Sequence, residues 1–403
     1  MSVHRVGLVA LHTSPLAPPG SADAGGMNVY VVALAEALAR RGLDVELLTR
    51  SSSPDDPQTG YTPNGIPVQF LRAGPQAAVA KDDLARHMFA FRDALRARPV
   101  FDLLHSHYWL SGAAALTVAE EQGIPHVQSL HTVAFLKNQN LAAGDHPEPQ
   151  ERLWAEQRLI GDSQLSIAST EAERDAIVTG YGATPSSVLV IPPGVDVKRF
   201  HPRRTGAEAV ESGPGRPVIL TLGRIQPLKG QDLAIRAIAG IDQDRRPKLV
   251  IAGAPTPGET KYLKSLHALV AELGVADDVE FVGTQSRERT AEWMRSAALV
   301  LLPSHSETFG LVALEAAASA TPVIASRASG MQESVSDGVS GILLDSREPL
   351  EWASAIDAVL SRPETLARLS AGALAFGARH SWESTADTTL DAYRAAVGIT
   401  ENQ

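Results

Sequence analysis

Short apolar segments alternate with longer helical patterns along the whole of this 403-residue chain. In the first half, the segments with the length and the branched apolar content of buried strands are residues 5–11, 44–49, 66–71, 102–106, 125–130, 164–169 and 187–191. In the second half they are residues 217–222, 247–252, 278–282, 298–302, 322–325 and 341–344. Helical patterns fill the gaps, for example at 27–40, 82–96 and 149–160. Strands that alternate with helices predict βαβ units around parallel sheets.

A stretch rich in proline and glycine, residues 192–216, separates the two halves. We place a linker there, between an N-terminal domain at 1–195 and a C-terminal domain at 215–380. The predicted fold class is α/β, with two doubly wound, Rossmann-like domains facing each other across a cleft. Apolar residues at helical spacing predict a final helix within 382–403, which we expect to pack back on the N-terminal domain.

Composition excludes several classes of function. The net charge is −10 and basic residues form no long block, so we expect no nucleic-acid or membrane partner. The chain has no cysteine, which excludes disulfides and thiol nucleophiles. Neither a signal peptide nor a membrane span is recognisable, so we expect a cytoplasmic protein. A homodimer is neither indicated nor excluded.

The most informative motif follows the predicted strand at 298–302 and carries two carboxylates, Glu307 and Glu315. Between them, Thr308, Phe309, Gly310 and Leu311 form a turn that enters a helix of small residues. Amide groups and the positive dipole end of such a helix suit a phosphate, while the carboxylates suit sugar or ribose hydroxyls. The plain alternative is that Glu307 caps the helix and Glu315 is a solvated helix position. The motif favours a sugar-nucleotide site.

A second loop supports this interpretation. Arg224 and Lys229 follow the predicted strand at 217–222, on a loop that ends at Gly230. A planar guanidinium fork and a point charge on one loop, with an amide-rich helix start on another, would make a cradle for a diphosphate. Surface ion pairs remain an alternative for either cation.

Polar residues also follow the strands of the first half. After the first strand come His12 and, further along, Asp23, Gly26 and Asn28, where glycine permits close backbone approach and the side chains could cap a helix or bind a ligand. The sequence lacks the Gly-x-Gly-x-x-Gly and Gly-Lys-Ser/Thr loops of dinucleotide and triphosphate sites.

Histidines end two further strands of this half. His105, His107 and His131 should reach one sheet edge, and a zinc site is the competing reading. No second paired-ligand motif accompanies them, so we expect no metal site. Asp242 and Asp244 form an Asp-x-Asp that we interpret as solvated turn residues.

With these motifs assembled, the chain resembles the retaining glycosyltransferases of the two-Rossmann GT-B class, of the family 4 type. The resemblance runs from Val6 to about Val397 and rests on Arg224, Lys229, Glu307 and Glu315. Within that class, residues 12–16, 23–31, 105–112 and 147–152 resemble the D-inositol 3-phosphate glycosyltransferases of mycothiol biosynthesis. Gln285 departs from the family pattern, which has a basic residue at that position, and Pro18-Pro19 departs at the first loop.

The resemblance implies a substrate pair and a role for each residue. It implies transfer of N-acetylglucosamine from UDP-GlcNAc to 1D-myo-inositol 3-phosphate, with no cofactor required beyond the UDP-sugar donor. The acceptor phosphate would be held by Lys81, Tyr108, Thr132 and Arg152, and His12, Asp23 and Asn28 would line the acceptor side. Arg224, Lys229 and Glu307 would act on the donor together with His131, which would position or polarise the donor sugar, and Gly26 would contact the donor.

Other functions share parts of this pattern. A sucrose-phosphate-type synthase would keep the donor chemistry and use a hexose phosphate as acceptor. A nucleotide-sugar 2-epimerase also uses two Rossmann domains, although it needs acid and base carboxylates in the first domain, where Asp23 is the only candidate. A non-catalytic sugar-nucleotide sensor would have little use for the complete donor set.

Overall fold

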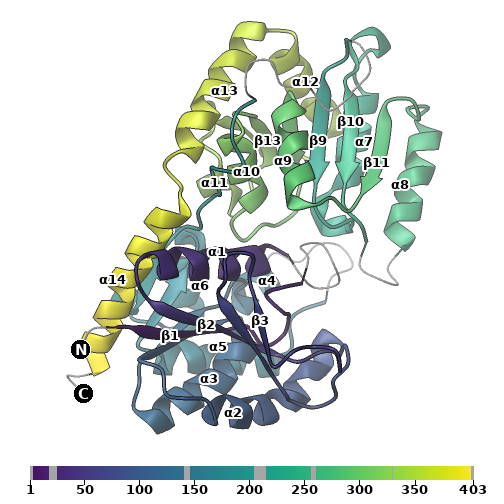
Figure 1. Ribbon diagram of the computed structural model, residues 1–403. Helices are drawn as coiled ribbons and strands as arrows, with labels where there is room; N and C mark the ends of the chain where they lie inside the picture. Colours follow the sequence, from purple (N-terminus) through teal and green to yellow (C-terminus); the bar gives the residue numbers. More distant parts are fainter. Residues whose placement is uncertain are drawn as a thin grey trace. The chain divides into compact units, whose positions relative to one another are not determined.

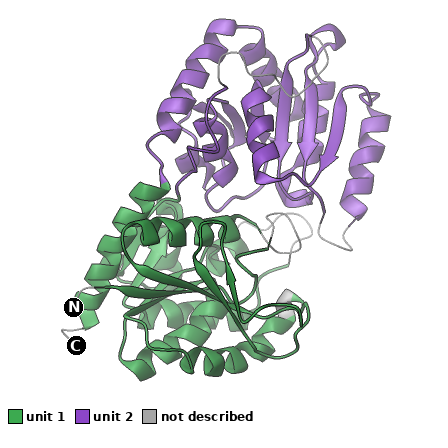
Figure 2. Cartoon of the chain, viewed as in Figure 1, with its two compact units in different colours: residues 1–19, 23–193, 382–403 green, residues 20–22, 194–381 purple. Residues whose placement is uncertain are grey.

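The computed structural model describes residues 3–17, 25–139, 146–203, 215–255, 260–328 and 330–400, without the side chains of residues 81 and 82. Figure 2 shows that it divides into two compact units. Of the described residues, unit 1 holds those up to Pro193 and those from Trp382, and unit 2 holds Gly194–Ser381.

Unit 1 contains an eight-stranded sheet in the order β3-β4-β2-β1-β5-β6-β7-β8. Its strands are β1 (Arg5–Val9), β2 (Asp44–Arg50), β3 (Thr59–Tyr61), β4 (Pro67–Leu71), β5 (Leu103–His107), β6 (His126–Ser129), β7 (Leu165–Ala168) and β8 (Val188–Val190). Neighbouring strands are parallel except β3, which runs antiparallel to β4. Because β1 lies between β2 and β5, the chain winds away from β1 in both directions, and a ligand site is expected where the loops after β1 and β5 diverge.

Helices cover both faces of this sheet (Figure 1). They are α1 (Gly26–Arg40), α2 (Met88–Arg96), α3 (Trp109–Gln122), α4 (Ala134–Gln139), α5 (Gln150–Asp162), α6 (Glu171–Tyr181) and α14 (Trp382–Thr400), with short 3₁₀ turns η1 (Lys81–His87) and η2 (Pro185–Ser187). Helices α2, α3 and α5 pack side by side along one face, and α14 packs against α1. The sequence predicted one continuous helix over 82–96, which is wrong: the backbone of His87 leaves helical geometry and separates η1 from α2.

The last helix, α14, is part of unit 1. Arg40, the last residue of α1, forms an ion pair of 3.0 Å with Glu383, and Arg41, which follows the helix, forms one of 2.7 Å with Asp387. Its apolar stripe is buried and includes Trp382 and Tyr393. The stripe at helical spacing is therefore a packing surface.

Unit 2 contains a six-stranded, all-parallel sheet in the order β11-β10-β9-β12-β13-β14. Its strands are β9 (Val218–Leu222), β10 (Lys248–Ala252), β11 (Val279–Gly283), β12 (Leu299–Leu302), β13 (Val323–Ser326) and β14 (Gly341–Leu344). Its helices are α7 (Gln231–Ala239), α8 (Lys261–Glu272), α9 (Arg287–Ser296), α10 (Leu311–Ala318), α11 (Met331–Ser334), α12 (Pro349–Leu360) and α13 (Pro363–Gly377), with 3₁₀ turns η3 (Pro227–Lys229) and η4 (Gln243–Arg245). Here β9 lies between β10 and β12, so the loops after β9 and β12 meet at the switch point of this second sheet.

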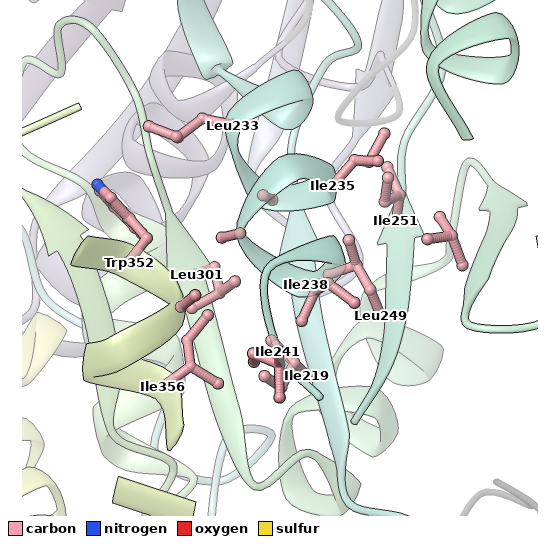
Figure 3. Close-up of a cluster of buried hydrophobic side chains, with 14 of the residues drawn as sticks. Ile219, Leu233, Ile235, Ile238, Ile241, Leu249, Ile251, Leu301, Trp352 and Ile356 are labelled. Carbon is pink, nitrogen blue, oxygen red and sulfur yellow. The ribbon is translucent and has the colours of Figure 1, made fainter. Parts of the chain in front are cut away.

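Strand residues in unit 2 alternate between two buried cores. Ile219 packs into the cluster with α7 and α12, while its neighbours Val218 and Leu220 pack into the cluster on the opposite face. Figure 3 shows the first cluster, in which Trp352 and Ile356 of α12 lie opposite the strand residues. Each such side chain contributes about 1.5–3 kcal/mol through burial. Burial on both faces explains why these strands are continuous apolar runs.

No helix among the described residues combines the length and the apolar character that crossing a membrane requires.

Candidate active site

The loop after β9 is shaped by close backbone contacts. Gly223 has φ 150°, and a Cβ placed on Gly253, at the end of β10, would lie 1.9 Å from the carbonyl oxygen of Gly223. Gln231, the first residue of α7, donates its side-chain amide to the carbonyl of Arg224 at 2.9 Å. The loop that carries Arg224 and Lys229 is therefore held between the end of β10 and the start of α7.

The loop after β12 is joined to this first loop. The amide of His305 donates to the carbonyl of Leu228 at 2.8 Å, and the ammonium of Lys229 forms an ion pair with the carboxylate of Glu307. Ser304 donates its hydroxyl to the same carboxylate at 3.1 Å. The structure thus brings together two predicted site residues that lie far apart in the sequence, and sequence reasoning missed Ser304 as a partner.

The turn at Thr308 to Leu311 has the geometry of an open helix start. Gly310 has φ 91°, a left-handed conformation that favours glycine, and α10 begins at the next residue. The amide of Gly330 donates to the carbonyl of Glu307 at 3.0 Å, and a Cβ on Gly330 would lie 2.2 Å from the carbonyl oxygen of Thr308. Phe309 is buried beneath the turn. Because the first amides of a helix lack intrahelical acceptors, the start of α10 suits an anion.

Glu315 lies on α10 with only 4% of its surface exposed, so the reading as a solvated helix position is wrong. Its carboxylate forms an ion pair of 2.6 Å with Arg287 at the start of α9. The guanidinium of Arg287 in turn lies over the ring of Phe200, 4.8 Å from its centroid. The sequence did not indicate Arg287 as a site residue. The family pattern has a basic residue two positions earlier, where this chain has Gln285.

The candidate residues of unit 1 gather where β1, β5 and β6 end. The rings of His12 and Tyr108 lie 4.4 Å apart between centroids, and His131 bonds to His107 through Nε2 and Nδ1 at 2.8 Å. Two of these residues have strained backbones: φ is 75° at Tyr108 and 61° at His131. Non-glycine residues in this region cost on the order of 1–3 kcal/mol each and concentrate at functional sites.

The histidines form a buried network. His105 bonds through Nδ1 to the hydroxyl of Tyr393 at 2.8 Å and through Nε2 to the hydroxyl of Ser129 at 2.9 Å. Burial lowers the pKa of His131 to about 3 and that of His107 well below its ordinary value. These imidazoles are therefore neutral at physiological pH. Both ring nitrogens of His105, Nδ1 of His107 and Nε2 of His131 are engaged in hydrogen bonds within the protein.

Arg152 on α5 is 2% exposed and heavily bonded. Its guanidinium donates to Glu156 at 2.6 Å, to Glu148 at 2.8 Å, and to the hydroxyl of Thr132 at 2.9 Å. It also lies over the ring of Tyr108, 4.8 Å from the centroid. Three of the four predicted phosphate residues are thus in contact, and the two glutamates are partners that the sequence did not indicate.

The remaining candidates are placed as follows. Gly26 and Asn28 lie in the first turn of α1, and Asn28 donates to the carbonyl of Ser14 at 2.7 Å, which ties the loop after β1 to this helix. Lys81 begins η1, and its side chain lies outside the described part of the chain. Asp23 also lies outside the described residues. Asp242 pairs with Arg245 at 2.9 Å in an exposed turn.

Solved structures with the same architecture match nearly the whole chain. Sucrose-phosphate synthase from Thermosynechococcus elongatus is 28% identical with a TM-score of 0.87, over 97% of this chain and 98% of that chain. Anabaena HepE in complex with UDP and glucose has a TM-score of 0.76 over 96% of this chain and 99% of that chain, and at 20% identity it supports the fold alone. The doubly wound sheets and these likenesses define the class: a glycosyltransferase with the GT-B fold.

Sequence comparisons narrow the class. Residues 25–194 match the family described as "Glycosyl transferase 4-like domain", and residues 203–375 match "Glycosyl transferases group 1". D-inositol 3-phosphate glycosyltransferase of Stackebrandtia nassauensis is 42% identical over 98% of this chain and 92% of the relative. The enzyme of that name from Frankia alni is 42% identical over 96% of this chain and 98% of the relative. The chain therefore belongs to the glycosyltransferase family of which these two enzymes are members.

Proposed function

We propose that this enzyme transfers N-acetylglucosamine from UDP-GlcNAc to 1D-myo-inositol 3-phosphate with retention of anomeric configuration, in the cytoplasm, as the first step of mycothiol biosynthesis. The observation that carries the proposal is the 42% identity, over 98% of the chain, to a protein named for the acceptor. The contacts of Arg152 with the ring of Tyr108 and the hydroxyl of Thr132 support it, because they bring together one cation and two hydroxyl-bearing residues that could bind an acceptor phosphate.

The acceptor phosphate would bind at the guanidinium of Arg152. Glu156 is fully buried beneath this group, whereas Glu148 lies at its partly exposed side and is shared with Lys137. A phosphate dianion would therefore replace Glu148 and leave Glu156 in place. Charge-assisted hydrogen bonds of this kind contribute about 1.5–3 kcal/mol each. The hydroxyls of Tyr108 and Thr132 would complete the site, with Lys81 as a further cation.

The donor would bind where the loops after β9 and β12 meet. Arg224, Lys229 and the first amides of α10 would receive the diphosphate, and Glu307 would bind hydroxyls of the sugar. Glu315 would bind the ribose, held in position by Arg287. Anabaena HepE, which shares the fold, was crystallised with UDP-glucose.

Catalysis would be electrostatic. As the bond from the anomeric carbon to the β-phosphate breaks, the sugar gains oxocarbenium character and the leaving phosphate gains negative charge. Lys229 and Arg224 would stabilise that charge, and the phosphate oxygen would accept the proton of the attacking hydroxyl on the same face. Each preorganised donor of this kind lowers the barrier by about 3 kcal/mol. The two cations take the place of a divalent metal, so we propose that none is required.

A second candidate keeps the donor site and uses a hexose phosphate as acceptor. The likeness to sucrose-phosphate synthase favours it, at 28% identity and a TM-score of 0.87. The cluster around Arg152 would hold either acceptor by its phosphate. The two candidate functions differ in the molecule that carries the phosphate, which is inositol in the first and a hexose in the second.

The decisive experiment is a product assay with UDP- and ADP-sugars against inositol 3-phosphate, glucose 6-phosphate and free inositol. We expect a glycosylated product only with UDP-GlcNAc and inositol 3-phosphate, and no inhibition by a chelator. Product with glucose 6-phosphate in place of inositol 3-phosphate would establish the second candidate. Equal use of free inositol would contradict the phosphate role of Arg152.

A further inference from the structure

A chain of aromatic side chains in unit 1 begins and ends on α14. Its members, in order of contact, are Trp382, Tyr30, His131, His107, His105 and Tyr393. This series of rings connects α14 to His131 from both ends: from Trp382 through Tyr30, and from Tyr393 through His105 and His107.

Each end of this chain is made of close contacts. Tyr30 packs edge-on against Trp382, with centroids 5.4 Å apart, and against His131, with centroids 5.0 Å apart. At the other end, His105 lies 4.3 Å from His107 between centroids and bonds to the hydroxyl of Tyr393 at 2.8 Å. His105 and His107 are fully buried, whereas His131 is partly exposed. His131 is thus the histidine of this chain that can contact a substrate.

The hydrogen bond between His107 and His131 allows two assignments of its proton. Two neutral imidazoles share one hydrogen between Nδ1 of His107 and Nε2 of His131, which are 2.8 Å apart. If His131 donates, the proton of His107 resides on Nε2. If His107 donates, its Nε2 carries only a lone pair, and the proton of His131 resides on Nδ1.

The surroundings of His107 distinguish these assignments. Its Nε2 is buried and has no hydrogen-bond partner within the described part of the chain. A buried N–H without an acceptor is rarer than a buried acceptor without a donor. The first assignment would create such an N–H, and the second does not. His107 is therefore the donor.

We infer that His107 is a positioning residue that fixes His131 as its Nδ1–H tautomer, so that His131 presents an N–H donor to an oxygen of the substrate. In this state the Nε2 lone pair of His131 is occupied by His107, and His131 has no lone pair with which to act as a general base. The low pKa of His131, about 3 because of burial, agrees with a neutral donor. The role toward substrate rests on the proposed function, whereas the tautomer is a property of the free enzyme.

The first test is nitrogen NMR of the full-length, histidine-labelled enzyme without substrate. We expect a protonated Nδ1 and an unprotonated Nε2 on both His107 and His131, with a coupling across the N–H···N bond. The variants His107→Asn and His131→Asn assign the signals. A protonated Nε2 on His131 would overturn the inference, whichever substrates the enzyme uses.

The second test is kinetic and uses paired variants at one position. Asparagine places an amide N–H close to the position of the imidazole Nδ1, so His107→Asn should keep the donor and retain kcat within about threefold, whereas His107→Phe should lose about tenfold or more. The KM for donor should change less than kcat. Circular dichroism checks that both variants are folded. Equal losses of kcat in the two folded variants would show that hydrogen-bond donation from residue 107 does not support catalysis.

His126 provides the matched control. It is a fully buried histidine on β6 that bonds to Ser106 and Ser163 and stands outside the chain of rings. His126→Asn should lower thermal stability without altering the nitrogen signals of His131. A shifted His131 signal in this control would mean that any buried histidine sets the tautomer, which would also contradict the inference. If the enzyme proves to use another acceptor, the same variants are compared with that acceptor.

Discussion

Lys229 and Glu307 form an ion pair between the loop after β9 and the loop after β12, although they are separated by 78 positions in the sequence. Both side chains keep part of their surface exposed, at 23% and 17%. The pair therefore lies at the rim of the switch point, where a bound diphosphate could reach the ammonium. Glu307 holds the cation in place before the donor arrives, so little reorganisation is needed when the leaving group develops charge.

Replacing Lys229 by alanine should lower kcat much more than it raises the KM for donor. The ammonium is expected to interact most strongly with the charge that develops on the leaving phosphate, and its loss should cost about a hundredfold in kcat. Steady-state kinetics with varied donor separate the two parameters. Lys248→Ala is the control, because Lys248 forms a partly exposed ion pair with Glu280 on the neighbouring strands. A change in KM alone would contradict the leaving-group role.

Replacing Arg152 by alanine should abolish efficient use of the phosphorylated acceptor and leave slow hydrolysis of the donor nearly intact. The guanidinium contacts Thr132 and Tyr108 in unit 1 and has no part in the proposed donor site. Transfer and hydrolysis are measured together by UDP release with and without acceptor. Arg158→Ala on the same helix is the control, since Arg158 is exposed. Parallel loss of transfer and hydrolysis would argue against an acceptor role.

The same position gives a prediction about stability. Arg152→Met would leave the carboxylate of Glu156 buried without its cation and should lower the free energy of unfolding by about 3 kcal/mol or more. Burial already raises the pKa of Glu156 above 4.5, and removing Arg152 raises it further. In the folded variant Glu156 then binds a proton that it releases in the unfolded chain. The loss in free energy of unfolding should therefore shrink as the pH falls toward the pKa of this glutamate in the unfolded chain. Urea unfolding of variant and parent across this range measures the effect, and a deficit that grows on acidification would contradict it.

Replacing Arg287 by methionine should weaken UDP binding by about tenfold, because a charge-assisted bond that orients Glu315 is lost. The loss should appear in calorimetric titration with UDP alone, without any acceptor. Arg289→Ala is the matched control two residues along α9, where the exposed Arg289 pairs with the partly exposed Glu292. Unchanged affinity in Arg287→Met would show that Glu315 does not depend on this pair.

Most of the fold could be predicted from sequence because its strands are buried on both faces. Ile219 and its neighbours pack into cores on opposite sides of the sheet, and such strands appear in a sequence as apolar runs between helical patterns. The short edge strand β3 (Thr59–Tyr61) carries no such run and was missed. The break at His87 was also missed, because apolar spacing does not separate a 3₁₀ turn from an α-helix that continues it.

The candidate site was predictable only in part. Loops after parallel strands can be located in the sequence, which is why Lys229 and Glu307 were expected near each other. The partners of Arg152 and Glu315 were not predictable, since Glu156 and Arg287 lie on helices whose charged residues look solvated in a sequence. Burial of a charge depends on tertiary packing, and no local pattern reports it.

Acidification should destabilise unit 1 well above the pH at which carboxylates titrate. Burial lowers the pKa of His126 and of His131 to about 3, against an ordinary value of 6.5. Below that ordinary value the unfolded chain binds protons that the folded chain does not, so stability falls as the pH drops, by about 1.4 kcal/mol per pH unit for each histidine. His105 and His107, whose pKa values burial also lowers, add to the slope. Urea unfolding between about pH 7 and about pH 5 measures it. His126→Asn removes one titrating group and should reduce this slope by about 1.4 kcal/mol per pH unit. A parent protein with the same free energy of unfolding across this pH range would show that the histidines are not buried as neutral groups.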